Sequence, residues 1–599
     1  MVQAINTLVD SDYQKAVYHA IEFGSDNIIV EALAGSGKTT LIKRSCEIIY
    51  NKQGVKPLAI AFGKRIQNEL KEKIGNIAQV QTLNSLGHGL VRKALNYREL
   101  DVDRKKYLQI SRKVVKDQNG TTDWEVNEKL SNELYSLTTF SMKTLTGTKS
   151  REALKKMIQD YNLDICHLDT VGNWLGYVIK EGDKLAKEGF LSFEDQLFLP
   201  YLWKLNSTYK YAWVFGDEMQ DTSSSALELF LKFTDNNTRI MGVGDRWQSI
   251  MGFTGANTDA LDRLKSRTNA ISLPLSICYR CPKSHLRLAQ KLVPAIEPSP
   301  TAIEGVIIDV DLKADMAGRY DYEELLPHLT GGELIICRKT APLIALCIKL
   351  IIARIPARII AGDSNLESSL SSLIDDISKV SGFRFERFPE FLEILFQSRQ
   401  SRLVEQGAFK IIANLRDRCD ALLACFEGFD SLVNIKSFKK SLSNLFVERE
   451  DSVTLSTIHT AKGLEAERVV FLHPGLCPHT FKGQNKESLQ QEANLEYVAL
   501  TRSKHTLILA CGSGVKKPQS KKVDDWAKDY QKSKEEEFTY DGTTDAFGNT
   551  NQQDFFKGCH SPQEIQDRFR SLAKQYHPDM PGGSTGLMQE LNRQYKLVC

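Results

Sequence analysis

The sequence predicts an α/β protein with two similar halves, each interrupted by a helical insertion, and a small all-α hairpin at the C-terminus. An apolar strand, a glycine-rich loop and a helix follow one another in IIVEALAGSGKTTLIKRSCEII, residues 28–49. A second alternation of apolar strands and helices begins near Gly332. Residues 97–191 and 365–449 show helical patterns without such strands. At 599 residues, the chain is too long for a single hydrophobic core.

The composition excludes a membrane protein and a disulfide-stabilised secreted one. Hydrophobic residues make up 42% and charged residues 26%, as in soluble globular proteins. The N-terminus lacks the basic start and apolar block of a signal peptide, and no apolar run is long enough to cross a bilayer. The 12 cysteines are scattered, which suits a reducing cytoplasm. The only Cys-x-x-Cys pair, Cys278 and Cys281, lacks partner ligands for a metal.

The glycine-rich loop has the features of a phosphate-binding site. Its glycines let successive backbone N–H groups converge, and the following helix directs its positive end toward the same point. Lys38 would reach the β- and γ-phosphates, and Thr39 would hold Mg²⁺. Ala32 stands where the general pattern has glycine. The predicted phosphate-binding residues are Ala34, Gly35, Ser36, Gly37, Lys38, Thr39 and Thr40. This loop predicts binding of a nucleoside triphosphate.

A pair of carboxylates follows a second apolar strand, in YAWVFGDEMQDTSSSALELF. The strand ends at Gly216 and presents Asp217 and Glu218 at its carboxyl end, where α/β sheets bind ligands. Asp217 would hold Mg²⁺ together with Thr39. Glu218 would orient or deprotonate the attacking water. The sequence therefore predicts hydrolysis of the bound nucleotide.

Further polar residues are placed to act on the terminal phosphate or the base. Asp245 and Gln248 follow another strand in RIMGVGDRWQSIMGFTGA. Arg280 and Arg502 are candidate arginines for stabilising charge in phosphoryl transfer. Near the N-terminus, Asp10 or Ser11 could cap a helix whose first turn carries Gln14; an amide matches the donor and acceptor pattern of an adenine edge.

The region after the glycine-rich loop offers candidates for nucleic-acid contact. A strand from Leu58 to Phe62 is followed by a basic helix, and Thr82 is placed to touch phosphate. Phe62 is either a stacking platform for a base or a buried residue at the end of a strand. Because the net charge is only +3, nucleic-acid binding has to come from a local groove.

Taken in order, these blocks resemble superfamily 1 helicases of the UvrD/Rep type, and in places the F-box helicase branch. The resemblance covers roughly residues 8–512 and rests on ALAGSGKTT, GDEMQDT, GVGDRWQSIMGFTGA, CYRCP, STIHTAKGLE and YVALTRSK. It implies two RecA-like parallel-sheet domains with ATP between them and single-stranded DNA across their top. The expected ranges are 1–96 and 192–285 for the first domain, 286–364 and 450–512 for the second, and 97–191 and 365–449 for the insertions.

The resemblance also assigns roles to individual residues. Gln14 would read the adenine, Tyr279 would stack on it, and Glu465 would contact the ribose. Gln248, Arg280 and Arg502 would face the γ-phosphate, with both arginines supplied by the second half. The expected DNA contacts are Phe62, Lys64, Thr82, Phe253 and His459. The chain departs from the family at Met251 and Thr254, both expected near the DNA strand, where the family often has an aromatic residue and an arginine; Asn84 replaces a common histidine.

The C-terminal tail is predicted to consist of a linker and a small helical module. Residues 513–552 are polar and charged and read as a flexible linker. Residues 553–599 predict a helical hairpin, with a capping box from Ser561 to Glu564. At its tip, the tripeptide His577, Pro578 and Asp579 resembles that of a compact J-domain, which would stimulate a DnaK-type chaperone. The alternative is a hairpin that merely packs against the helicase.

The sequence thus predicts an ATP- and Mg²⁺-dependent DNA helicase of the cytoplasm of a bacterial or phage-infected cell. By resemblance it would move 3′ to 5′ on single-stranded or forked DNA in replication, recombination or repair. Two alternatives remain: a chaperone-recruiting adaptor that binds DNA without unwinding it, and a translocase that strips proteins from single strands.

Overall fold

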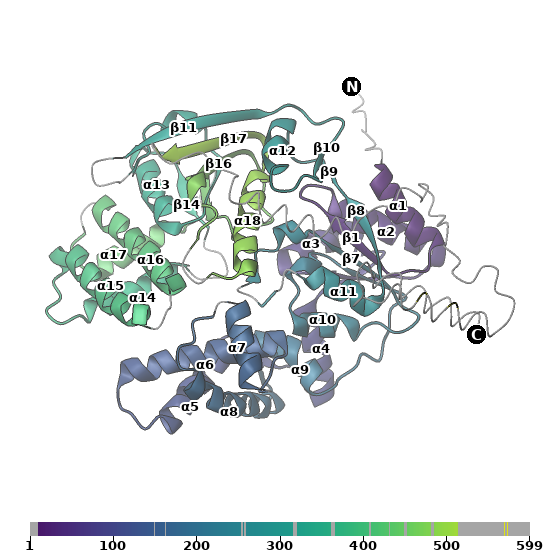
Figure 1. Cartoon of the computed structure of the whole chain (residues 1–599), viewed down its shortest axis with the longest axis horizontal. Coiled ribbons are helices and arrows are strands. Elements are labelled where there is room, and N and C mark those ends of the chain that lie inside the picture. The colour runs from purple at the N-terminus through teal and green to yellow at the C-terminus, as the bar shows by residue number, and fades with distance from the viewer. Residues whose placement is uncertain are drawn as a thin grey trace. The chain divides into compact units, whose positions relative to one another are not determined.

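The computed structural model (Figure 1) divides the chain into two units, Met1–Ser520 and Lys521–Cys599. It describes residues 10–148, 150–161, 163–252, 255–256, 259–314, 320–360, 366–405, 409–429, 432–447, 452–480 and 484–512, with Arg568 and Leu572. In the second unit, Arg568 and Leu572 are helical, and Leu572 is buried. The predicted linker and the tripeptide at 577–579 lie outside the described residues. Among the described helices, none is both long and apolar enough to span a bilayer.

The first half is built on a six-stranded parallel sheet in the order β3-β2-β6-β7-β1-β8. Its strands are β1 (Ile28–Ala32), β2 (Leu58–Ala61), β3 (Gln79–Thr82), β6 (Trp213–Gly216), β7 (Arg239–Gly244) and β8 (Ile271–Leu275). Strands β2 and β6 are buried along their whole length, as expected for parallel strands covered on both faces. The carboxyl ends of the adjacent strands β6, β7 and β1 therefore meet at one edge.

Helices cover both faces of this sheet. They are α1 (Asp12–Phe23), α2 (Lys38–Gln53), α3 (Lys64–Ile74), α4 (Leu83–Leu95), α9 (Phe193–Leu202), α10 (Ser224–Leu231) and α11 (Ala260–Thr268). Helix α1 is tied to β7 because the Arg239 guanidinium donates hydrogen bonds to the carbonyls of Ala20 and Ile21, both at 2.9 Å. A cation suits the negative end of a helix. This contact fixes the helix that carries Gln14.

The first insertion has a hydrophobic core of its own. It contains α5 (Lys106–Gln118), α6 (Trp124–Thr144), α7 (Arg151–Asp160), α8 (Leu168–Lys187) and the short strands β4 (Asp101–Val102) and β5 (Phe190–Leu191). Its core cluster includes Leu134 and Leu175 and reaches Leu199 of α9. At its base, buried Asp195 of α9 accepts hydrogen bonds from Lys106 (2.7 Å) and Tyr107 (2.6 Å). A buried carboxylate is tolerated when it is paired and hydrogen-bonded in this way.

The second half is built on a seven-stranded sheet in the order β12-β11-β17-β16-β13-β15-β14. All its neighbouring strands are parallel except β11 and β12. Its strands are β11 (Val306–Ala314), β12 (Tyr320–Asp321), β13 (Leu334–Cys337), β14 (Ala357–Ile359), β15 (Val453–Thr457), β16 (Ala466–Leu472) and β17 (Ser503–Gly512). The sheet begins with β11, earlier in the chain than the start near Gly332 that the sequence predicts. The sequence did not reveal β11 because the strand is partly exposed and its apolar pattern is weak.

The second insertion shares its core with the second sheet. Its helices are α14 (Leu366–Ser378), α15 (Phe388–Glu405), α16 (Phe409–Gly428) and α17 (Ile435–Asn444), and they lie beside α13 (Thr340–Ile352) in Figure 1. One cluster joins Phe388 and Phe438 of the insertion to Leu343 of α13 and Ile335 of β13. The aromatic rings of Phe388 and Phe438 meet edge to face, 5.1 Å apart. This insertion is therefore a helical extension of the second half.

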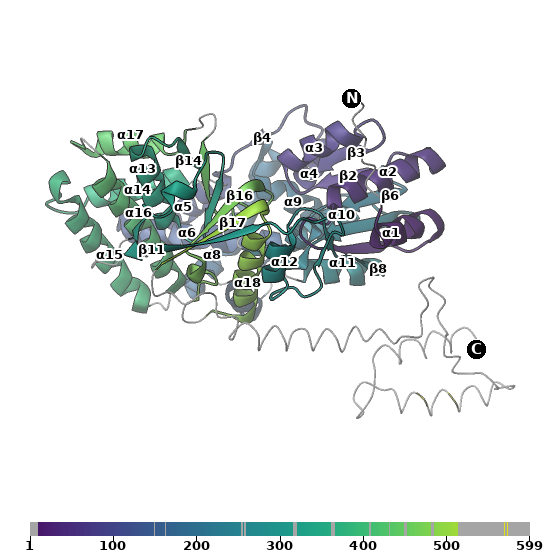
Figure 2. The same cartoon turned by 90° about the horizontal axis from the view of Figure 1, so that it is seen from above.

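Helix α18 (Lys486–Leu500) lies between the two sheets in both views (Figures 1 and 2). The segment that connects the sheets carries β9 (Ile277–Cys278), α12 (Lys283–Ala289) and β10 (Glu297–Pro298). A mixed cluster packs Leu33 and Ile250 of the first half against Leu495 and Val498 of α18. The two halves thus meet through an apolar contact beside the glycine-rich loop.

Candidate functional site

The glycine-rich loop follows β1 and packs against the segment that connects the two sheets. Gly35 has φ +67° and Gly37 has φ +85°, in the left-handed region that favours glycine. A Cβ on Gly35 would lie 2.7 Å from Cβ of Arg280 and 2.8 Å from Sγ of Cys278. The Gly35 carbonyl also accepts a hydrogen bond from the backbone N–H of Tyr279 at 2.9 Å. Glycine at position 35 is therefore required by conformation and by space.

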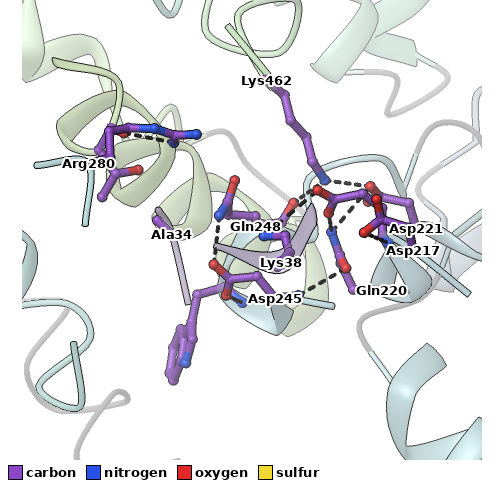
Figure 3. Close-up of polar contacts among 12 residues, drawn as sticks. Ala34, Lys38, Asp217, Gln220, Asp221, Asp245, Gln248, Arg280 and Lys462 are labelled. Atoms are coloured by element: carbon purple, nitrogen blue, oxygen red, sulfur yellow. Dashed lines mark hydrogen bonds and ion pairs between the residues drawn. The ribbon is translucent and has the colours of Figure 1, made fainter. Parts of the chain in front are cut away.

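The two carboxylates after β6 lie near the lysine of the loop; Figure 3 labels Lys38 and Asp217. Lys38 Nζ is 3.8 Å from Oε1 of Glu218. Glu218 has φ +51°, which is uncommon for a residue with a side chain and often marks a functional site. Asp217 Oδ1 accepts a hydrogen bond from the Glu218 backbone N–H at 2.9 Å, and Gln220 Nε2 donates to Glu218 Oε2 at 2.5 Å. Both carboxylates are thereby oriented by fixed donors.

The surroundings drive the pKa values of these two carboxyls apart. Burial, together with the charge of Glu218, raises the pKa of Asp217 to about 7. Burial also acts to raise the pKa of Glu218, but Lys38 and Lys462 outweigh it and lower this pKa to about 2. Two neighbouring groups separated in this way are suited to different tasks. Glu218 stays ionised and able to accept a proton at neutral pH.

Asp217 and Thr39 fit a hard divalent cation. Both line the same cavity as Lys38, and they supply a carboxylate and a hydroxyl oxygen, the ligand types that Mg²⁺ prefers. The raised pKa of Asp217 reflects a buried carboxylate short of positive charge, which a bound cation would provide.

A series of hydrogen bonds links the carboxylates to the loop that follows β7, at the same edge of the sheet. Gln220 Oε1 accepts from the Asp245 backbone N–H at 3.0 Å. Asp245 Oδ2 accepts from Gln248 Nε2 at 2.7 Å. Gln248 lies on the 3₁₀ turn η2 (Arg246–Gln248), directly after β7. A change in the position of one of these side chains would therefore alter the hydrogen bonds of the others.

Arg502 joins this series of hydrogen bonds from the second half. It is only 1% exposed, and its Nη2 donates to Gln248 Oε1 at 3.2 Å. Its Nε donates to the carbonyl of Val498 at 2.8 Å. Burial and, to a lesser degree, the neighbouring Arg280 lower its pKa to about 10, so it stays charged at neutral pH.

Arg280 lies on the connecting segment between the two sheets. The first sheet ends at Leu275 and the second begins at Val306, so Arg280 belongs to neither; the resemblance had assigned it to the second half, whereas the expected ranges had placed it at the end of the first. Its Nε forms an ion pair with Oε2 of Glu465 at 2.6 Å, and its Nη1 donates to the Thr501 carbonyl at 3.3 Å. Arg280 is thus attached to the second half by side-chain contacts.

These groups surround one cavity of about 650 Å³. Its lining brings together most predicted site residues: Gly35, Ser36, Gly37, Lys38, Thr39, Asp217, Glu218, Gln248, Tyr279, Arg280, Glu465 and Arg502. The lining comes from both halves and the connecting segment. A volume of this size suits a nucleotide.

Four residues predicted for the nucleotide site lie outside the lining of the cavity: Gln14, Ala34, Thr40 and Asp245. Gln14 is buried beside the loop, its Nε2 3.8 Å from where a Cβ on Gly37 would lie, and its Oε1 accepts from the Ser11 backbone N–H at 2.8 Å in a capping box. The Ala34 backbone N–H donates to the Tyr497 hydroxyl at 3.0 Å. Thr40 is exposed.

Comparison with known proteins identifies the family. The UvrD/REP helicase N-terminal domain matches residues 13–269, and the UvrD-like helicase C-terminal domain matches residues 384–513. The chain belongs to the UvrD/Rep-type helicases of superfamily 1. Its first match covers the glycine-rich loop and both carboxylates, and its second covers Glu465 and Arg502.

Named relatives agree with this assignment. A probable DNA helicase II homologue of Mycoplasma capricolum is 22% identical over 80% of this chain and 81% of that protein. The ATP-dependent DNA helicase PcrA of Bacillus subtilis is 21% identical over 82% of this chain and 81% of its own length. F-box DNA helicase protein 1 of Schizosaccharomyces pombe is 23% identical over 80% of this chain, which spans only 55% of that protein.

Two residues of this UvrD/Rep-type site, Lys462 and Tyr497, had no role predicted from the sequence. Lys462 Nζ lies 2.5 Å from Oδ2 of Asp221 and 2.5 Å from the carbonyl oxygen of Gln248. Tyr497 places its buried hydroxyl on the glycine-rich loop. Both residues lie inside recognised blocks, STIHTAKGLE and YVALTRSK, and that position is the signal that could have marked them.

The candidate DNA contacts are only partly described. Phe62 follows the end of β2 and is 43% exposed, which removes the alternative of a buried residue at the end of a strand. Thr82 caps α4 by accepting from the Ser85 N–H at 3.2 Å, and Lys64 donates to Gln67 at 2.9 Å. His459 follows β15 and is half-buried. Phe253 and Thr254 lie outside the described residues.

The packing at Gly35 generates a test. We expect Gly35→Ala to weaken ATP binding at least about tenfold, because its Cβ would push the loop away from Arg280 and Cys278. The measurement is equilibrium binding of a fluorescent ATP analogue.

Gly54→Ala is the matched control. Gly54 has φ +66° at the end of α2, with no neighbour within 4 Å of an added Cβ, so this variant should share only the left-handed strain of about 1 kcal/mol. Equal ATP affinities for the two variants would contradict the packing argument.

Proposed function

We propose that the protein is an ATP- and Mg²⁺-dependent motor that moves 3′ to 5′ along single-stranded DNA and unwinds forked DNA in replication, recombination or repair. The observation that carries the proposal is the shared cavity. The glycine-rich loop and the carboxylates line it from the first half, and Arg502 lines it from the second. The direction of movement rests on family resemblance alone.

In this proposal, several side chains each contribute to hydrolysis. Lys38 would contact the β- and γ-phosphates. Thr39 and Asp217 would hold Mg²⁺, whose charge would offset that of the phosphates. Glu218 orients the attacking water and accepts its proton, a role for which its lowered pKa keeps it ionised.

The groups that would face the γ-phosphate come from three loops. Gln248 is held by Asp245 and Arg502, and Arg280 is held by Glu465. Arg502 would offset the negative charge that develops on the transferred group. Since it reaches the cavity from the second half, hydrolysis requires the halves to be closed, and their opening and closing would become steps along a strand.

The nucleotide base and the strand would be held by other residues. Gln14 would read the adenine edge, Tyr279 would stack on the base, and Glu465 would contact the ribose. The proposed strand contacts are Phe62, Lys64, Thr82, Phe253 and His459. The exposed ring of Phe62 supports a stacking role.

The first test is ATP hydrolysis with and without single-stranded DNA, for the wild type and for Glu218→Gln. We expect DNA to stimulate turnover, and the substitution to lower stimulated turnover by about 10²-fold or more, because it removes the proton acceptor but keeps its shape. ATP binding should persist in the variant.

The outcomes also separate the alternatives. No hydrolysis by the wild type under either condition would favour the DNA-bound adaptor. Hydrolysis without unwinding of forked substrates would favour a translocase that strips proteins from single strands.

For the tail, we propose recruitment of a DnaK-type chaperone through His577, Pro578 and Asp579, on the sequence pattern alone. The full chain should stimulate the chaperone's ATP turnover, measured with Glu218→Gln in the helicase to silence its own hydrolysis. Adding His577→Gln should remove this stimulation. Retained stimulation would contradict the proposal and leave the hairpin as a packing element.

A further inference from the structure

The loop that carries Gln248 is held from outside by side chains of the second half. Asn494 Nδ2 donates to the carbonyl of Ser249 at 2.9 Å and to that of Arg246 at 3.2 Å. Lys462 Nζ donates to the carbonyl of Gln248 itself at 2.5 Å. Three backbone carbonyls within four consecutive residues of the first half thus accept hydrogen bonds from the second. These contacts fix the backbone at the point from which the Gln248 side chain projects.

The two donors are themselves held in place. Asn494 is 1% exposed, and its Oδ1 accepts a hydrogen bond from Gln490 Nε2 at 2.8 Å. Both the nitrogen and the oxygen of the Asn494 side-chain amide are therefore hydrogen-bonded, which defines the orientation of that amide. The Lys462 side chain is 9% exposed and also pairs with Asp221 at 2.5 Å (Figure 3). Neither side chain can leave its position without breaking a buried polar contact.

The donors come from two separate elements of the second half. Asn494 lies on α18, whereas Lys462 lies in the turn between β15 and β16. Within the first half, the loop is held by Arg246, which pairs with Glu31 at 3.0 Å. One end of the loop is thus anchored to β1, and its carbonyls are held by the second half. Separation of the halves would remove the second set of contacts and leave the first.

We propose that Lys462 and Asn494 are positioning residues that hold the loop Arg246–Ser249 so that Gln248 faces the terminal phosphate only when the two halves are closed. Lys462 also lines the nucleotide cavity, but neither residue acts on the phosphate in this role. Each acts through the backbone of the loop, and together they make the orientation of Gln248 depend on closure. The inference rests on the proposed role of Gln248 in hydrolysis.

A simpler reading is that Lys462 only neutralises the buried carboxylate of Asp221. The two readings predict different results when that charge is removed. If neutralisation were its whole task, Lys462→Met would be harmful because it leaves Asp221 uncompensated, and Asp221→Asn would restore activity. If Lys462 positions the loop, the double variant stays impaired because the Gln248 carbonyl still lacks its donor.

The experiment compares steady-state ATP hydrolysis at saturating single-stranded DNA with the equilibrium affinity for an ATP analogue. We expect Lys462→Met and Asn494→Ala to lower kcat by about 10²-fold, the cost of misplacing a reacting group by roughly an ångström. Affinity for the analogue should stay within about twofold, because neither residue contacts the phosphates in this account. Lys462→Arg should recover most of the turnover, since it keeps the charge and the donors.

Two further variants sharpen the test. The Lys462→Met, Asn494→Ala double variant should be no slower than the slower single variant, because both substitutions release the same loop. Lys486→Gln, at an exposed position of α18, should behave as the wild type.

The inference is overturned if turnover is unchanged in both single variants. It is also overturned if kcat and affinity fall together, or if Asp221→Asn restores Lys462→Met. If the wild type hydrolyses ATP and the variants turn over at the same rate, the positioning role is refuted and the proposed function stands. A wild type without DNA-stimulated hydrolysis would refute the proposed function and this inference with it.

Discussion

The site depends on a positive charge that the fold places almost out of reach of water. Arg502 is 1% exposed, and among the described residues no carboxylate lies within ion-pair distance of it. Its guanidinium is held by the carbonyls of Val498 and Leu464 and by the amide oxygen of Gln248. Burial of an ion without a counter-charge costs several kcal/mol, and neutral acceptors offset only part of that cost. An anion in the adjoining cavity, such as a terminal phosphate, would supply the missing charge.

One face of α18 transmits this constraint to the rest of the site. Asn494, Tyr497 and Thr501 are spaced so that they share a side of the helix. Asn494 holds the loop after β7, Tyr497 contacts the glycine-rich loop, and the Thr501 carbonyl accepts from Arg280. A shift of this helix would therefore alter three parts of the nucleotide site together, which is how closure of two domains can be coupled to chemistry.

Much of this arrangement follows from local sequence. The strand, loop and helix around Lys38 were predictable because glycine conformation and apolar runs are local signals, and Asp217 and Glu218 were predictable because they follow a buried strand. The weak strand β11 was not, since its exposed residues carry little apolar pattern. Lys462 and Tyr497 lie inside recognised blocks, but their partners could not be read from sequence, because each contacts residues more than 200 positions away and such pairing is decided by the tertiary fold. The place of Arg280 was not fixed by the sequence either, because the resemblance put it in the second half and the expected ranges in the first; it lies on the connection and reaches the second half through its side chain.

The most direct test of the account is the turnover of Arg502→Ala at saturating single-stranded DNA, measured beside its affinity for ATP. We expect ATP still to bind, whereas stimulated turnover falls by about 10³-fold or more, because an arginine that stabilises the transition state is removed. Arg267→Ala, which removes an exposed guanidinium paired with Glu228 on the first half, should turn over as the wild type. Unchanged turnover in Arg502→Ala would show that the nucleotide site is complete within the first half, and would contradict the central claim that the two halves share it.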